Sequence, residues 1–229
     1  MSGLSTVDRR RLWREAASLA RARLNRTTGA RIGRWASWGL LVGFGVATLA
    51  ARYGDGAPTA LSGFAPSAAR FAAWLAAGPI ALAAANGRST RDRADGVEAF
   101  ASSFGVAASA LRAGRLAGVG LACARAIAVP SIGIALLAAG LAGSIAEARS
   151  ALVAVPVLAL FAMVAGAAVG ALAVIAEHLA PERGMRALLL LVILPWIASD
   201  LAGWSGASVP GALDALLTTA LALAGGGGA

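Results

Sequence analysis

The stretch "RSTRDRADGVEAFASSFG", residues 88–105, carries most of the side chains in the middle of this chain that could do chemistry. It lies between two long apolar runs, and its charges fall within eleven positions. Carboxylates beside an Asp-Gly pair could hold a metal ion or form ion pairs with a partner protein. The charged residues are Arg88, Arg91, Asp92, Arg93, Asp95 and Glu98.

The residues that follow Asp95 exclude a metal-dependent phosphotransferase of the CDP-alcohol type. Asp95 and Gly96 match the start of that motif, but Phe100 stands where an arginine is needed. Ala113 and Ala117 stand where two further aspartates are needed. Without those carboxylates the segment has no ligands for Mg²⁺. A docking role, based on ion pairs, is the interpretation that remains.

The single histidine, His178, lies close to Glu177, Glu182 and Arg183. One nitrogen ligand beside carboxylates is a weak zinc pattern, so we interpret this stretch as a cytoplasmic loop. Two Gly-x-Ser triplets at 203–208 are expected on the opposite side of a membrane from His178, which excludes a Ser-His pair. The sequence has no phosphate-binding loop with its lysine. We therefore expect no enzyme activity, no metal and no cofactor in this chain.

The composition is that of a membrane protein. Hydrophobic residues make up 59% of the 229 positions and charged residues 14%, with a mean hydropathy of +0.75; soluble domains are about 25% charged. The net charge of +9 could indicate a nucleic-acid binder, but the arginines lack interleaved aromatic residues and lie beside apolar runs. Arginine at the cytoplasmic ends of spans explains the charge better. The single cysteine, Cys123, excludes an internal disulfide.

The apolar runs predict an all-α integral membrane protein, because helices satisfy their own backbone hydrogen bonds in lipid. Small residues dominate these runs and predict close helix packing. The last two runs are short enough to be tilted or partly re-entrant. Six transmembrane helices are expected at about 35–51, 67–86, 126–146, 151–175, 185–201 and 210–225.

The third span is expected to begin at 126, because Arg125 would be costly in hydrocarbon. This start leaves residues 87–125 as a long cytoplasmic segment. With the N-terminus inside, 17 of the 20 arginines flank spans on the cytoplasmic side. We therefore expect both termini in the cytoplasm and the protein in the bacterial inner membrane. No secretory signal peptide is evident.

The N-terminal region, residues 1–34, is expected to form an amphipathic helix in the cytoplasmic interface. Its apolar residues share one face of a helix and its arginines lie opposite. The alternative is a basic tail that only fixes topology. The apolar face comprises Leu12, Trp13, Ala16, Ala17, Leu19, Ala20 and Leu24.

The segment "RDRADGVEAFASSFGVAASALRAGRL", residues 91–116, resembles the region after the second span of type-2 ABC exporter permeases. The likeness includes the haem-exporter B-type permeases of cytochrome c maturation. Glu98 completes the acidic and glycine frame of that region, and Arg115 takes the place of its lysine. The proline usual near Gly105 is absent. Residues 172–203 also resemble the basic loop and fifth span of the haem exporter.

The resemblance implies a permease subunit with a cytoplasmic coupling helix between spans two and three. Its expected partners are two copies of an ABC-type ATPase, a second permease copy, the lipid bilayer and further membrane subunits. ATP and Mg²⁺ belong to the partner, and haem enters only as a cargo. The implied coupling residues are Arg91, Asp92, Arg93, Asp95, Gly96, Glu98, Phe100 and Phe104, with a second contact at Glu177, His178, Glu182 and Arg183.

Two other functions remain open at this stage. One is the substrate-binding membrane subunit of an energy-coupling-factor importer, which also has about six spans. The other is a membrane assembly subunit that transports nothing, with residues 88–98 serving only as a solvated loop that fixes topology.

Overall fold

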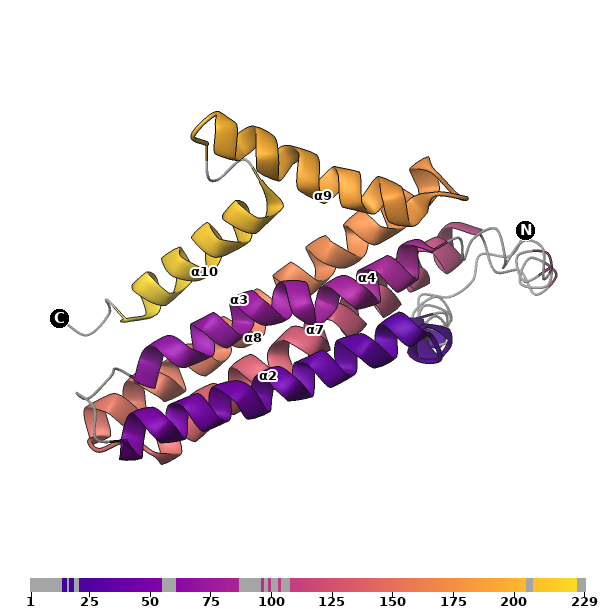
Figure 1. Cartoon of the computed structure of the whole chain (residues 1–229). Coiled ribbons are helices and arrows are strands. Elements are labelled where there is room, and N and C mark those ends of the chain that lie inside the picture. The colour runs from indigo at the N-terminus through magenta and orange to yellow at the C-terminus, as the bar shows by residue number, and fades with distance from the viewer. Residues whose placement is uncertain are drawn as a thin grey trace.

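The computed structural model describes residues 14–15, 17–18, 21–54, 61–86, 96, 99, 103, 108–204 and 208–225. All regular structure in these ranges is helical, in agreement with the predicted fold class (Figure 1). The elements are α2 (Thr28–Tyr53), η1 (Leu61–Gly63), α3 (Phe64–Leu75), α4 (Ala77–Ala85), α7 (Ala108–Gly140), α8 (Ile145–Leu179), α9 (Gly184–Leu201) and α10 (Val209–Gly225).

Four helical stretches in the described residues are long and apolar enough to cross a membrane. They are Phe64–Ala85, Ser109–Gly140, Ile145–Leu179 and Gly184–Leu201, while Val209–Ala224 is apolar but shorter. α2 has 26 residues and carries arginines in both its first and last turns. A multi-pass membrane protein fits these helices, but six separate spans are not confirmed.

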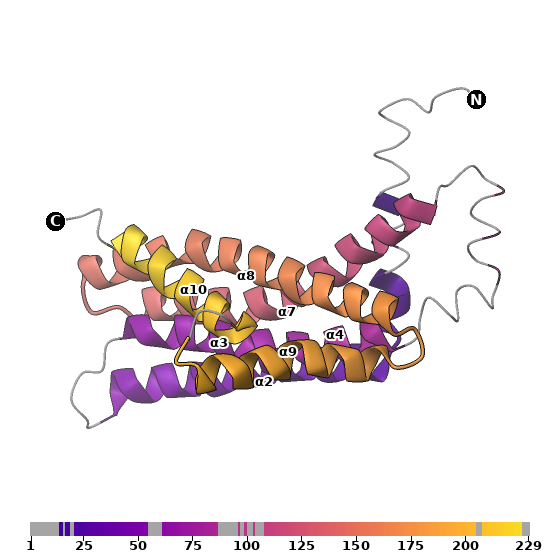
Figure 2. The ribbon, with the colours of Figure 1, turned by 90° about the horizontal axis from the view of Figure 1, so that it is seen from above.

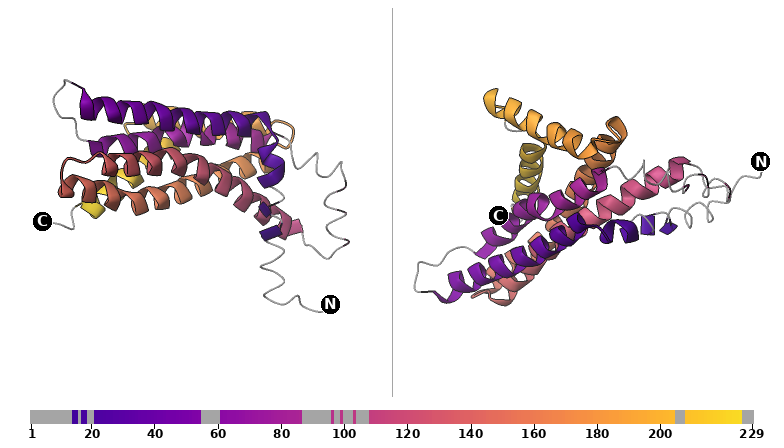
Figure 3. Two further views of the ribbon diagram at one scale, coloured as in Figure 1. Left: turned by 90° about the horizontal axis from the view of Figure 1, so that it is seen from below. Right: turned by 45° about the vertical axis from the view of Figure 1, so that its right-hand side comes forward.

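The last two helices, α9 and α10, are not arranged as two successive antiparallel spans, which was the expectation. α9 begins beside the end of α4, because a Cβ on Gly184 would meet the carbonyl oxygen of Ala85. α10 ends at the other end of the bundle, where Leu221 lines a cavity together with Leu61 and Ala138. Thus α9 and α10 lead in succession away from one end, and α10 does not return to it (Figures 1 and 2). Figure 3 shows α9 leaning out from the other helices.

α7 and α8 are packed backbone to backbone through small residues. A Cβ on Gly166 would lie 2.6 Å from the Ala124 Cα, and a Cβ on Gly170 would lie 2.8 Å from the Gly120 Cα. The pairs Gly120/Ala124 and Gly166/Gly170 each have the four-residue spacing that lets membrane helices approach closely. The close packing predicted from the small residues is confirmed for this pair.

Two prolines shape the neighbouring helices. Pro79 has no N–H for the carbonyl of Leu75, which explains why the second apolar run is divided into α3 and α4. Pro130, inside α7, likewise leaves the carbonyl of Ala126 without its helical donor. The buried hydroxyl of Ser37 on α2 donates to that carbonyl at 3.0 Å. A side chain thus satisfies a backbone group freed by proline, as buried membrane helices require.

The helix that holds the third expected span begins well before 126, and the start of that span at 126 is not confirmed. α7 runs without interruption from Ala108 through Arg125, so the predicted segment 87–125 is part of the same helix from 108 onward. Arg125 is exposed, and a long arginine side chain on the outside of a helix can carry its charge towards an interface. The helix therefore does not end at Arg125, and the place where it enters the membrane stays a prediction.

The described end of the N-terminal region, residues 21–34, joins the bundle. Residues 21–25 are helical, and Leu24 is fully buried within the main hydrophobic cluster. Thr27 then caps α2, its hydroxyl accepting from the Ala30 N–H at 3.3 Å. Leu24 therefore packs on protein, whereas the interfacial interpretation placed it in lipid.

Candidate functional site

Most of the predicted coupling residues lie outside the described residues: Arg91, Asp92, Arg93, Asp95, Glu98, Phe100 and Phe104. The exception is Gly96, which lies in a turn with a φ of +68°. That value is in the left-handed region, which glycine adopts readily because it has no Cβ. Another residue at this position would strain the turn.

The predicted second contact divides into a buried and an exposed part. Glu177 is 2% exposed, whereas His178, Glu182 and Arg183 are exposed. Glu177 lies in the last turn of α8, and the other three continue into the turn before α9. The three exposed residues form an accessible polar surface, and Glu177 belongs to the interior.

Glu177 forms an ion pair with Arg115 of α7. The Oε2 atom of Glu177 lies 3.6 Å from the Nη1 atom of Arg115, and 3% and 19% of the two side chains are exposed. The structure thus brings together Arg115, near the end of the segment that resembles the coupling region, and Glu177 from the second predicted contact. Sequence reasoning named both residues but did not pair them.

The backbone around Glu177 is closely packed against two other helices. A Cβ on Gly184, the first residue of α9, would lie 3.0 Å from the Glu177 Cα and would also meet the carbonyl of Ala85 in α4. The ends of α4 and α8 and the start of α9 therefore meet at one point. The Arg115–Glu177 pair connects the base of α7 to this junction.

Because the Arg115–Glu177 pair is largely buried, its contribution to stability differs from that of a surface ion pair. Two charges withdrawn from water gain little net stability, but removal of one partner of a buried ion pair costs about 3–5 kcal/mol. The pair therefore acts as a specific connection between α7 and the α4–α8–α9 junction. Loss of the ion pair would therefore affect the packing of α7, α4, α8 and α9.

A second ion pair was missed by sequence reasoning. Arg70 of α3 donates from Nε to the carboxylate of Asp214 in α10, and from Nη2 to the hydroxyl of Thr218 at 3.1 Å. Arg70 is the one charged residue of the α3–α4 stretch and Asp214 that of α10. Lone opposite charges in two apolar helices were the signal for this pairing.

Within the described ranges, no three His, Cys, Asp or Glu side chains gather closely enough to hold a metal ion. Comparisons of the chain with protein-family models, with curated proteins and with solved structures found no match. The function of the Arg115–Glu177 end is therefore interpreted from its geometry and from the chemistry of its residues.

Proposed function

We propose that the chain is the membrane-spanning permease subunit of an ATP-driven exporter, and that a separate ATPase docks at the Arg115–Glu177 end. The observation that carries the proposal is the buried ion pair. It connects α7, the helix that follows the charged segment 88–105, to the junction of α4, α8 and α9. A force on the N-terminal part of α7 would be transmitted to the other helices through this ion pair.

The length of α7 suits this role. Its 33 residues extend for about 50 Å, while the hydrocarbon core of a bilayer is about 30 Å thick. Figure 2 shows the first turns of α7 reaching beyond the other helices. A continuous helix of this length can transmit movement from an aqueous surface into the membrane.

The tight contact between α7 and α8 would transmit a movement of α7 to α8 within the membrane. Because Gly120 and Ala124 lie directly against Gly166 and Gly170, α7 and α8 have to move as one body. α9 and α10 pack more loosely and have large exposed apolar side chains. In the proposed mechanism, the α7–α8 body moves against α9 and α10, and this movement opens a path next to them.

The first test is the composition of the native assembly. The chain is purified from its host in mild detergent and the intact complex is weighed. We expect two copies of an ATP-binding subunit and a second permease. Recovery of the chain without an ATP-binding subunit contradicts the proposal, and tight binding of a small vitamin by the isolated chain would point to an importer subunit.

The second test separates docking from coupling. Asp95→Asn with Glu98→Gln is expected to lose the ATPase, since these residues lie in the proposed docking segment. Glu177→Gln, in contrast, is expected to retain the ATPase but to lose stimulation of ATP hydrolysis by substrate. Asp200→Asn, which removes an exposed carboxylate near the end of α9 and outside the proposed contacts, is the control. Normal stimulation in Glu177→Gln would contradict the coupling role of the ion pair.

A further inference from the structure

A cavity of about 550 Å³ lies at the end of the bundle opposite the Arg115–Glu177 pair. Its walls come from α3, α7, α8 and α10, and its lining includes Ala138 near the end of α7 and Arg149 near the start of α8. Ligand pockets are usually about 300–1,000 Å³. The cavity is therefore large enough for a head group and the adjoining part of an acyl chain.

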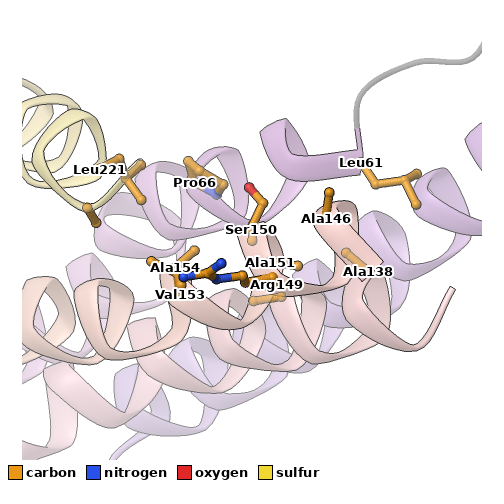
Figure 4. A pocket seen from close by; sticks show the side chains of 13 residues that line it. Leu61, Pro66, Ala138, Ala146, Arg149, Ser150, Ala151, Val153, Ala154 and Leu221 are labelled. Carbon is orange, nitrogen blue, oxygen red and sulfur yellow. The ribbon is translucent and has the colours of Figure 1, made fainter. Parts of the chain in front are cut away.

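The cavity has one polar wall and one apolar wall. Arg149 and Ser150 are exposed at its rim, whereas Leu61, Ala138 and Ala151 are buried and form a small hydrophobic cluster separate from the main core. Figure 4 shows the side chains of Arg149 and Ser150 beside Pro66 and Ala154. A cation and a hydroxyl next to an apolar floor suit a molecule with an anionic head and a hydrocarbon tail.

The charge of Arg149 is available to such a molecule. In the described part of the chain, no carboxylate lies within ion-pair distance of its guanidinium. The nearby Glu147 carboxylate is engaged with the backbone N–H of Gly143 at 2.8 Å. Arginine binds phosphate oxygens through charge-assisted hydrogen bonds, frequently two in parallel.

The depth of the cavity also fits a lipid. Arg149 lies four residues after Ile145, the first residue of α8, which is about 6 Å along the helix axis. This position is close to the bundle end, where lipid head groups lie, and the apolar wall extends from there along Ala135 and Ala154 towards the middle of the bundle. We propose that this cavity binds a phospholipid whose head group carries a net negative charge, with the phosphate on Arg149 and Ser150 and the upper acyl chain on the alanine wall.

One wall of the cavity is held in place by the second ion pair. Leu221 and Ala224 of α10 line the cavity, and Arg70 connects α10 to α3 through Asp214 and Thr218. The lipid would therefore contact a helix whose position depends on a polar clamp. This site does not depend on the proposed transport function, because it needs neither an ATPase nor a second copy of the chain.

The test is a lipid titration of the full chain in detergent, read by native mass spectrometry. Phosphatidylglycerol, phosphatidylcholine and inorganic phosphate are compared. We expect tight binding of one phosphatidylglycerol, weaker binding of phosphatidylcholine and no effect of millimolar phosphate. Equal affinity for the two lipids, or full displacement of phosphatidylglycerol by phosphate, would overturn the proposal.

Three variants locate the site. Arg149→Gln is expected to weaken phosphatidylglycerol binding about tenfold, which corresponds to about 1.4 kcal/mol. Ala146→Trp, at the exposed rim, should obstruct the cavity and weaken binding of both lipids. Arg52→Gln removes an exposed arginine at the same end but outside the cavity lining, and should leave affinity unchanged. An equal loss in the Arg52 and Arg149 variants would show a general surface charge effect and refute the site.

Discussion

The α7–α8 pair and the α9–α10 pair are built in opposite ways. α7 and α8 meet through glycine and alanine with no space for a further methyl group, and a buried ion pair connects their ends. α9 presents large apolar side chains outward, including Leu190, Leu194 and Trp196, and α10 is tied to α3 by the half-exposed Arg70–Asp214 pair. The helices α7 and α8 form a fixed unit, and the helices α9 and α10 form a peripheral layer.

This difference shows where sequence changes should matter most. In membranes, helices associate through close packing and internal hydrogen bonds, because lipid already solvates apolar side chains. Substitutions at the α7–α8 contact or in its ion pair should therefore reduce stability strongly. Substitutions in the peripheral pair should change the position of α10 and leave overall stability nearly unchanged.

The largest expected effect is at Glu177. Glu177→Ala removes the buried carboxylate that faces Arg115, and we expect the free energy of unfolding to fall by about 3–5 kcal/mol. The measurement is unfolding in mixed micelles. Glu182→Ala, which removes an exposed carboxylate five residues later, should change stability by less than about 0.5 kcal/mol. Similar losses in the two variants would mean that the ion pair is energetically unimportant.

The next effect is at the helix crossing. Gly166→Ala places a methyl group 2.7 Å from the Ala124 Cβ, so the two backbones have to separate, and we expect a loss of about 2–3 kcal/mol. Gly43 on α2 has nothing within 4 Å of its added Cβ. Gly43→Ala should therefore stabilise the protein by up to about 1 kcal/mol through helix propensity. Changes of the same sign in both variants would contradict the tight crossing.

A smaller effect is expected at Ser37. Ser37→Ala leaves the Ala126 carbonyl without a donor in the bundle interior, and we expect a loss of about 1–2 kcal/mol. In Ser37→Ala/Pro130→Ala, residue 130 regains an N–H for that carbonyl, so the double variant should be more stable than Ser37→Ala alone. If the second substitution brings no recovery, the Ser37 hydroxyl does not replace the missing donor.

The helices were predictable from sequence because length and hydropathy determine them locally. Their ends were less predictable: Arg125 suggested a membrane boundary, but α7 continues through Arg125 and begins at Ala108. The path of α10 could not be predicted from arginine counting, because no arginine follows Arg186. The positive-inside argument is therefore silent about the last helix.

The ion pairs also could not be predicted from the sequence alone. Arg115 and Glu177 are 62 positions apart, and their meeting depends on how α7 and α8 are rotated about their axes. That rotation is set by the Gly120–Gly170 and Ala124–Gly166 contacts. Sequence reasoning identified the small residues and the charges separately, but only the geometry of the crossing connects them. Most of the predicted coupling segment lies outside the described residues, so its docking role stays a prediction.

The smallest effect on stability is expected at the Arg70–Asp214 clamp, where 44% and 54% of the side chains are exposed. Arg70→Gln should lower the free energy of unfolding by less than about 1 kcal/mol, because exposed ion pairs contribute little. Hydrogen exchange should nevertheless rise in 209–225 and stay unchanged in α7 and α8, since the clamp positions α10 alone. Exchanging the charges, Arg70→Asp with Asp214→Arg, should restore protection, while Asp200→Asn on exposed α9 should have no effect. If exchange increased throughout the bundle, α10 would belong to the fixed unit, and the distinction between the two pairs of helices would fail.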